Sequence, residues 1–127
     1  MFNRRQVKRP GVAVLELALI LPVILVLVLG IAEFAAVFFV RHAMLNAARD
    51  AARSFSIREV NSSGAIALAT ERLPGSSLSF SVTASGDGEM DCWVDIRVPI
   101  SSAALGDPLR VMGGGDLAVR VTMRREE

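Results

Sequence analysis

An uninterrupted apolar run near the N-terminus constrains the fold of this chain most strongly. Leu17 to Val40 holds 24 residues with a single charged side chain, Glu33. At about 1.5 Å per residue, a helix of this length extends about 36 Å, which is enough to cross a hydrocarbon core of about 30 Å. The run therefore predicts one membrane-spanning helix. In a chain of 127 residues it leaves room for one small domain.

The net charge differs in sign on the two sides of Gly11. Arg4, Arg5, Lys8 and Arg9 are the charged residues before Gly11, and all 13 acidic residues follow it. Because Lys and Arg next to a span stay preferentially in the cytoplasm, we expect a cytoplasmic N-terminus and an extracytoplasmic C-terminal domain. Without this leader, 10 basic side chains face 13 acidic ones, a net charge of −3. This balance argues against a nucleic-acid partner, since phosphate binding needs a basic surface.

A secretory signal peptide is a competing interpretation of such an N-terminus. Signal peptides carry an apolar region of about 7–15 residues, followed by small residues at the cleavage site. Gly30-Ile31-Ala32 offers a site of this kind. The apolar run is longer than that region, which favours a retained membrane helix.

The helical pattern continues past the span to about Ile57. Apolar residues recur there at three- and four-residue spacing, and alanine, a strong helix former, is frequent. We therefore expect one helix over residues 12–57, with a transmembrane part at 17–40. Pro22 removes a backbone donor and clashes with the carbonyl four residues before it, which predicts a kink or a stretch of unwound backbone.

Residues 58–127 predict a small α+β domain. Asn61-Ser62-Ser63-Gly64 indicates a helix N-cap, and Ala65–Leu73 is expected to form a short second helix that Pro74-Gly75 ends. A loop is expected over Ser101–Gly115. Alternating apolar residues predict a hairpin and a further strand: Leu78, Phe80 and Val82; Met90, Cys92, Val94, Ile96 and Val98; and Leu117, Val119, Val121 and Met123.

Short strands with one apolar face are marginal in water unless another element covers that face. The outer half of the long helix is the candidate cover. The predicted fold class is thus α+β: a long membrane-spanning helix continues into a small domain with a short second helix and a three- to four-stranded antiparallel sheet.

The start of the long helix carries a recognisable pattern. Gly11-Val-Ala-Val-Leu-Glu16 behind a basic leader resembles the type IV prepilin signal, in which a peptidase cleaves after the glycine. With proline six residues after the glutamate, Gly11–Pro22 resembles the N-terminus of the TadE family, pilin-like proteins of tight-adherence (Tad) pilus systems. Asn46–Arg53 is similar to the helix of that family, and Val121–Glu126 resembles its closing strand. TadF and TadG proteins share the N-terminal pattern, although the short chain fits TadE better.

The resemblance implies a minor pilin or pseudopilin that a prepilin peptidase cleaves between Gly11 and Val12, removing the leader 1–11. It implies as partners that peptidase, other pilin or pseudopilin subunits, a pilus assembly platform in the bacterial inner membrane, and the lipid bilayer. The domain would then be periplasmic. The alternative is a permanently anchored single-span protein that keeps its leader and carries a periplasmic binding or scaffolding domain.

Two acids in the apolar segment need a role, because a charge at the centre of a bilayer costs about 2.5–3.5 kcal/mol. Glu16 is either an interfacial acid favoured by the positive end of its own helix, or, by the resemblance, the partner of the Val12 α-amine that cleavage creates on a neighbouring subunit. Glu33 either reaches headgroup water or pairs with Arg41 or His42 near the outer interface, or it contacts a partner helix.

The sequence offers little for enzymatic chemistry. It has one His, one Cys and no Tyr, without the spacing of a metal site or of a nucleophile and its base. We therefore expect no enzymatic activity, cofactor, metal or small-molecule substrate. Cys92 is expected to be a small buried hydrophobe, with an intermolecular disulfide as the alternative. Trp93 is expected on the other side of the strand, either as an exposed contact residue or under the 101–115 loop.

Overall fold

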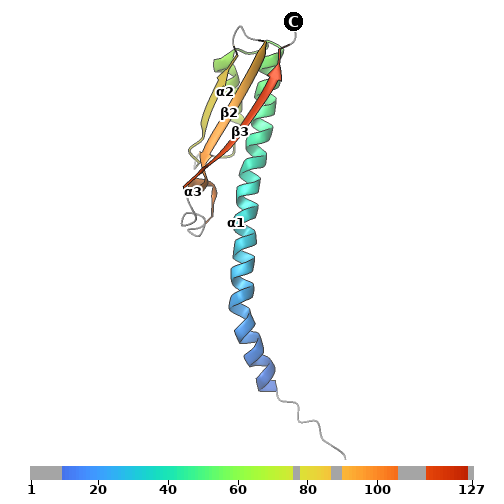
Figure 1. The fold of residues 1–127 in the computed structure, drawn as a ribbon, viewed down its shortest axis with the longest axis vertical. Helices are drawn as coiled ribbons and strands as arrows, with labels where there is room; N and C mark the ends of the chain where they lie inside the picture. Colours follow the sequence, from blue (N-terminus) through green and yellow to red (C-terminus); the bar gives the residue numbers. More distant parts are fainter. Residues whose placement is uncertain (1–9, 76–77, 87–89, 106–113, 126–127) are drawn as a thin grey trace, which may run out of the picture. The chain divides into compact units, whose positions relative to one another are not determined.

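The computed structural model describes residues 10–75, 78–86, 90–105 and 114–125. The elements follow in the order α1 (Pro10–Ser56), α2 (Ser62–Arg72), β1 (Ser81–Ser85), β2 (Asp91–Pro99), α3 (Ile100–Ala103) and β3 (Asp116–Arg124) (Figure 1). The predicted α+β class, with a long apolar helix, a short helix and three antiparallel strands, is confirmed. The chain divides into two compact units, Met1–Ala32 and Glu33–Glu127.

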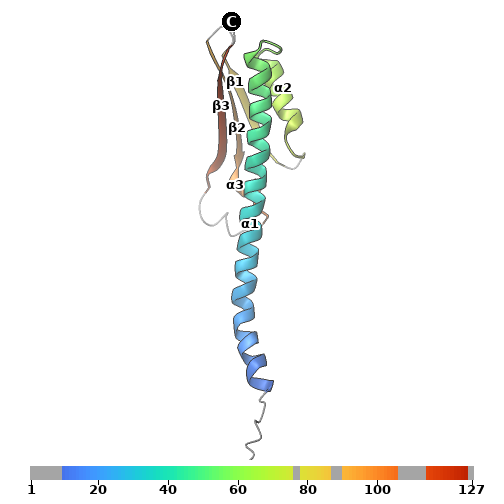
Figure 2. The same ribbon diagram turned by 90° about the vertical axis from the view of Figure 1, so that its right-hand side faces the viewer.

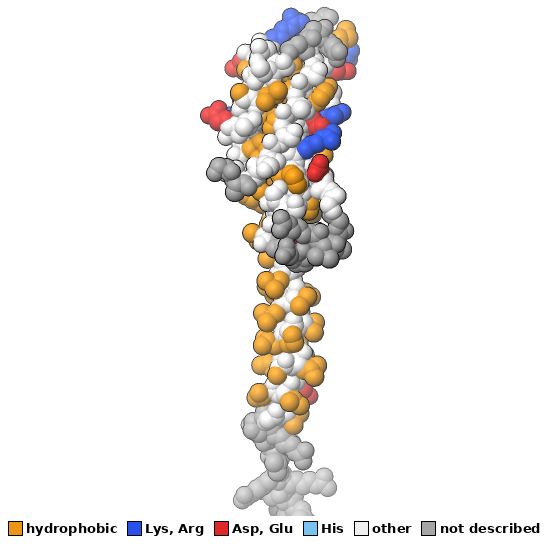
Figure 3. Space-filling model, turned by 90° about the vertical axis from the view of Figure 1, so that its left-hand side faces the viewer, with side chains coloured by type: hydrophobic (Ala, Val, Ile, Leu, Met, Phe, Trp, Pro, Cys, Tyr) orange, Lys and Arg blue, Asp and Glu red, His pale blue; other side chains and the backbone are white. Residues whose placement is uncertain are grey.

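The described residues of the first unit form the N-terminal part of α1. The helix begins at Pro10, a position where the missing N–H of proline costs nothing because the first N–H groups of a helix have no partner within it. Every residue from 11 to 29 is exposed. Figure 3 shows hydrophobic side chains along this stretch. The helix is long and apolar enough to cross a membrane, with a mean hydropathy of 3.1 in its most apolar window.

Pro22 lies inside α1, and the helix continues through it without interruption. Of the two expected alternatives, a kink or a stretch of unwound backbone, the second is therefore wrong. The blue part of α1 in Figure 1, which contains Pro22, bends while it remains helical.

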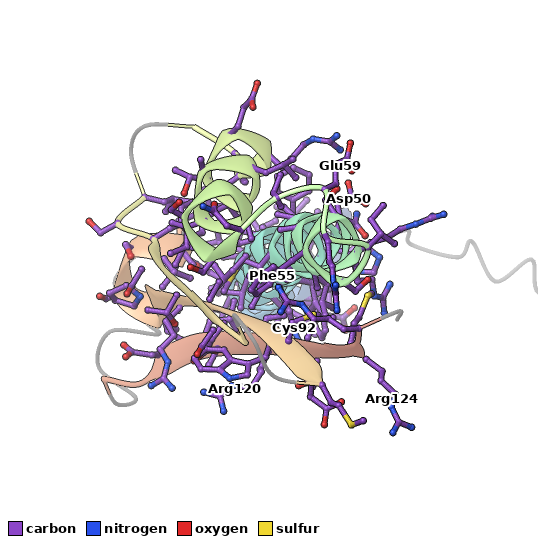
Figure 4. The ribbon with its side chains drawn as sticks, turned by 90° about the horizontal axis from the view of Figure 1, so that it is seen from above. Asp50, Phe55, Glu59, Cys92, Arg120 and Arg124 are labelled. Atoms are coloured by element: carbon purple, nitrogen blue, oxygen red, sulfur yellow. The ribbon has the colours of Figure 1, made fainter. Side chains whose placement is uncertain are left out.

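The core of the second unit lies between the helices and one face of the sheet. Figures 2 and 4 show α1 and α2 on the same side of the strands. The Cys92 Sγ lies 3.3 Å from the Met123 carbonyl oxygen and 3.9 Å from that of Ala52, so β2 packs directly against α1. The buried residues of α1 recur every three or four positions and include several alanines, which allow close approach: Val40, Met44, Ala47, Ala48, Ala51, Ala52 and Phe55.

The sheet has the strand order β1-β2-β3, with both pairs antiparallel. The apolar alternation predicted for the central strand is confirmed at four positions, where the side chains are fully buried: Cys92, Val94, Ile96 and Val98. Met90 was expected on the same face, but it is 66% exposed. The expectation fails because β2 begins only at Asp91, so the alternation of the strand does not determine the side on which Met90 lies.

Burial also determines the protonation state of the one cysteine, Cys92. Cys92 is inaccessible in the core, and burial raises the pKa of its thiol above the ordinary value. The thiol therefore stays protonated at neutral pH, and the prediction of a small buried hydrophobe is confirmed.

The connections show how local signals shape the domain. The side chain of Asn61 accepts a hydrogen bond of 2.9 Å from the Gly64 N–H and caps α2 as predicted. Gly86, with φ of +130°, ends β1 where a Cβ would lie 2.6 Å from the Cys92 Cα, so only glycine fits. The expectation of a loop throughout Ser101–Gly115 is wrong at its start, because α3 forms a helical turn there. Residues 106–113 lie outside the described part of the chain.

Candidate functional site

The peptide bond between Gly11 and Val12 lies in the first turn of α1. A Cβ added at Gly11 would meet no atom within 4 Å, so the described fold does not require glycine at this position. A requirement for a small residue here would come from a partner that handles this bond.

Glu16 lies on the exposed apolar part of α1, beside Leu15 and Leu17, which are also exposed. Within the described residues its carboxylate has no hydrogen bond or ion pair. It lies beyond the first turn of the uncleaved helix, where the field of the helix dipole has fallen off. The favourable effect of its own helix end is therefore small, and a partner cation would have to come from elsewhere.

Glu33 opens the second unit and is buried by it. Its Oε2 accepts a hydrogen bond of 3.0 Å from the Leu105 backbone N–H, which links α1 to the segment after α3. Arg41 and His42, the cations suggested as its partners, are exposed and form no ion pair with it among the described residues. Sequence reasoning missed this contact because its donor is a main-chain group 72 residues away, and any residue except proline supplies such a donor.

Removing the Glu33 carboxylate should loosen this link. A hydrogen bond to a charged group contributes about 1.5–3 kcal/mol, so Glu33→Ala should lower the free energy of unfolding of the domain by about that amount, and Glu33→Gln by less. Thermal unfolding of the detergent-solubilised chain, followed by the fluorescence of Trp93, measures this. Glu71→Ala, on the exposed surface of α2, is the control. Equal stability of the Glu33→Ala and control variants would contradict a stabilising role.

The surface of α1 next to Glu33 remains apolar. Phe34, Phe38 and Phe39 are exposed, and so is Leu105 beside the Glu33 carboxylate. Exposed large apolar side chains grouped in this way mark a surface that contacts lipid or protein. Val40, at the end of the predicted span 17–40, is already buried in the domain core, so the last part of that span belongs to the folded unit.

Comparison with known proteins bears on this helix. The family model described as TadE-like protein matches residues 11–53. The N-terminal segment of this chain is TadE-like. No curated protein and no solved structure matches the chain.

The TadE-like segment begins at Gly11 and follows α1 almost to its end at Ser56. It contains all the residues predicted to function in processing and assembly: Gly11, Val12, Glu16, Pro22 and Glu33. The resemblance predicted from the sequence is therefore confirmed over this segment. The helix α2 and the sheet lie outside the match.

Proposed function

We propose that this chain is a minor pilin or pseudopilin of a Tad pilus, cleaved by a prepilin peptidase between Gly11 and Val12. The observation that carries the proposal is the coincidence of three boundaries. These boundaries fall within three residues, because the last basic residue of the leader is Arg9, α1 starts at Pro10 and the TadE-like match begins at Gly11. The mature chain would lie in the bacterial inner membrane, with its N-terminus cytoplasmic and its domain periplasmic, before it joins other pilin subunits.

The position of the bond suits cleavage. The first turn of a helix frays readily, because its N–H groups have no intrahelical partner, and a peptidase needs the chain in a locally opened form. Cleavage removes the four leader cations and creates an α-amine on Val12 with an ordinary pKa of about 7.7–8.0. This amine is largely protonated at neutral pH, so processing places one cation at the start of the apolar helix.

Assembly then gives Glu16 a partner. Apolar contacts between helices in lipid discriminate poorly between alternative axial positions, because lipid tails are as apolar as the side chains they replace. A carboxylate in a low-dielectric environment does discriminate between axial positions, because a position that leaves this buried charge unpaired costs several kcal/mol. Pairing of Glu16 with the Val12 amine of a neighbouring subunit would thus select one register of the packed helices.

A second candidate function is a permanent membrane anchor that presents a binding or scaffolding domain. The observation that favours it is the compact second unit, which has its own core and a sheet face that no other described element covers. In both cases we propose that the chain has no catalytic activity of its own, and that the cleavage at Gly11 is performed by another protein.

Substitution of Glu16 tests the assembly role. Glu16→Ala should leave the chain in the membrane and cleaved, but should reduce the yield of pili sheared from cells at least about tenfold, because the Val12 amine loses its buried partner. Glu16→Gln should reproduce most of the loss, since the amide carries no charge. Leu15→Ala, next to it on the same exposed helix, is the control. Wild-type pilus yield with Glu16→Ala would refute the assembly role of this carboxylate.

A further inference from the structure

The helices cover only one face of the sheet. In Figure 4, Arg120 and Arg124 point away from α1 and α2, toward a face that no other described element covers. On β1 this outer face carries only small hydroxyl side chains, which is typical of a solvated sheet surface: Ser81, Thr83 and Ser85. The part formed by β2 and β3 has a different composition.

Asp95, in the middle of β2, is buried although it belongs to this outer face. Its Oδ2 accepts hydrogen bonds from Nε and Nη2 of Arg97, at 3.1 and 3.0 Å, and from Nη2 of Arg120, at 3.1 Å. Burial alone would raise the pKa of Asp95, but the hydrogen bonds and charges of Arg120 and Arg97 outweigh it and lower the pKa below its ordinary value. The carboxylate therefore stays ionised and holds both guanidinium groups in place.

Trp93 completes the cluster. The guanidinium carbon of Arg120 lies 4.5 Å from the centroid of the Trp93 ring, within the range of a cation–π contact. Trp93 is half-buried, so it is neither freely exposed nor enclosed. We call Trp93, Asp95, Arg97 and Arg120 the arginine platform.

Most N–H donors of Arg97 and Arg120 are not bonded to Asp95. The side chains of Arg97 and Arg120 are each 54% exposed, while that of Asp95 is 5% exposed. A guanidinium has five N–H donors, and the contacts to Asp95 occupy only a minority of them. Two cations face one anion, so the platform has a net positive charge. Its side chains are already ordered, which lowers the entropic cost of binding.

We propose that the arginine platform is the docking surface for an acidic segment of a different protein subunit. Exposed guanidinium groups bind carboxylates bidentately, and arginine and tryptophan are the residue types that dominate protein interfaces. This inference does not depend on the pilin role, because an anchored scaffold would present the same face.

Charge also decides against the other occupants. A twofold contact centred on the platform would set each platform against its equivalent, so guanidinium groups would oppose guanidinium groups. Lipid headgroups and nucleic acids need a broad basic surface, whereas exposed carboxylates lie on the same face at the ends of the strands, at Asp91 and Asp116. A localised pair of cations fits a short acidic protein segment.

The fluorescence of Trp93 provides the test, because the chain has one Trp and no Tyr. A blocked oligoglutamate peptide, titrated into the full-length protein in detergent micelles, should change this fluorescence saturably, and an oligoglutamine peptide should not. Arg97→Gln and Arg120→Gln should each weaken the binding about tenfold, the loss of one charge-assisted contact. Arg124→Gln removes the same charge from β3 without touching the platform, and should change the binding less than about twofold.

Two further substitutions distinguish a loss of binding from a loss of folding. Arg97→Lys and Arg120→Lys keep a cation beside Asp95 and protect folding, but they remove the planar fork and should still weaken binding severalfold. Several results would overturn the proposal: no saturable response to oligoglutamate, equal weakening by Arg124→Gln, an equal response to anionic lipid vesicles or to an RNA oligomer, or self-association that Arg97→Gln abolishes.

Discussion

Gly11→Arg should leave the chain at its full length. The substitution puts a long cationic side chain at the bond proposed for cleavage, while the described fold has open space at this position. Maturation should therefore be abolished with no loss of membrane insertion or of domain stability. Intact-mass analysis of the membrane-extracted protein reads this out directly, since the uncleaved chain retains its N-terminal 11 residues.

Gly11→Ala is the matched control for this experiment. Alanine is the smallest change at the site and should permit cleavage, which separates a need for a small residue from any effect of substitution itself. If the Gly11→Arg chain were shortened normally and built pili in normal amounts, Gly11 would have no role in processing. A permanently anchored protein gives another result, because its mass would include the leader before and after substitution.

Phe55→Ala should produce the largest loss of stability. Phe55 is the largest fully buried side chain in the described part of the chain, and it lies near the end of α1 in the core of the second unit. The guanidinium carbon of Arg125 lies 5.0 Å from its ring centroid, so truncation also removes a cation–π contact. Removal of a buried phenylalanine costs about 3–5 kcal/mol, a large fraction of the about 5–15 kcal/mol that stabilises a typical domain.

Thermal unfolding of the solubilised chain, followed by Trp93 fluorescence, measures this loss. Phe38→Ala is the control, since Phe38 lies on the same helix but is exposed, and its truncation leaves no cavity. The Phe55 variant should unfold at a much lower temperature than either the Phe38 variant or the wild type. A difference in unfolding free energy below about 1 kcal/mol would mean that Phe55 does not fill the core as described.

Much of the fold could be predicted because its signals are local. The spacing of Met44, Ala48, Ala52 and Phe55 marks the face of α1 that is buried, and the alternation along Cys92–Val98 marks the inner face of β2. Asn61 caps α2 through an N–H only three residues away. Such patterns depend on the geometry of one helix or one strand, so the sequence alone contains them.

The contacts that sequence reasoning missed join distant parts of the chain. The hydrogen bond of Glu33 to the Leu105 N–H depends on where the segment after α3 lies, and that position follows from the packing of the whole domain. The burial of Asp95 depends on the register of β2 with β3, which sets Arg120 directly opposite it. Asp95 lies on the side of the strand opposite the apolar residues, and Arg97 and Arg120 both donate hydrogen bonds to it there.

In the function proposed above, processing creates the N-terminus that assembly uses. The most direct measurement is the intact mass, with N-terminal sequencing, of the wild-type protein recovered from cells that form functional pili. We expect a chain that begins at Val12, with Glu16 as its fifth residue. A chain that still begins at Met1 in such cells would contradict the proposed function.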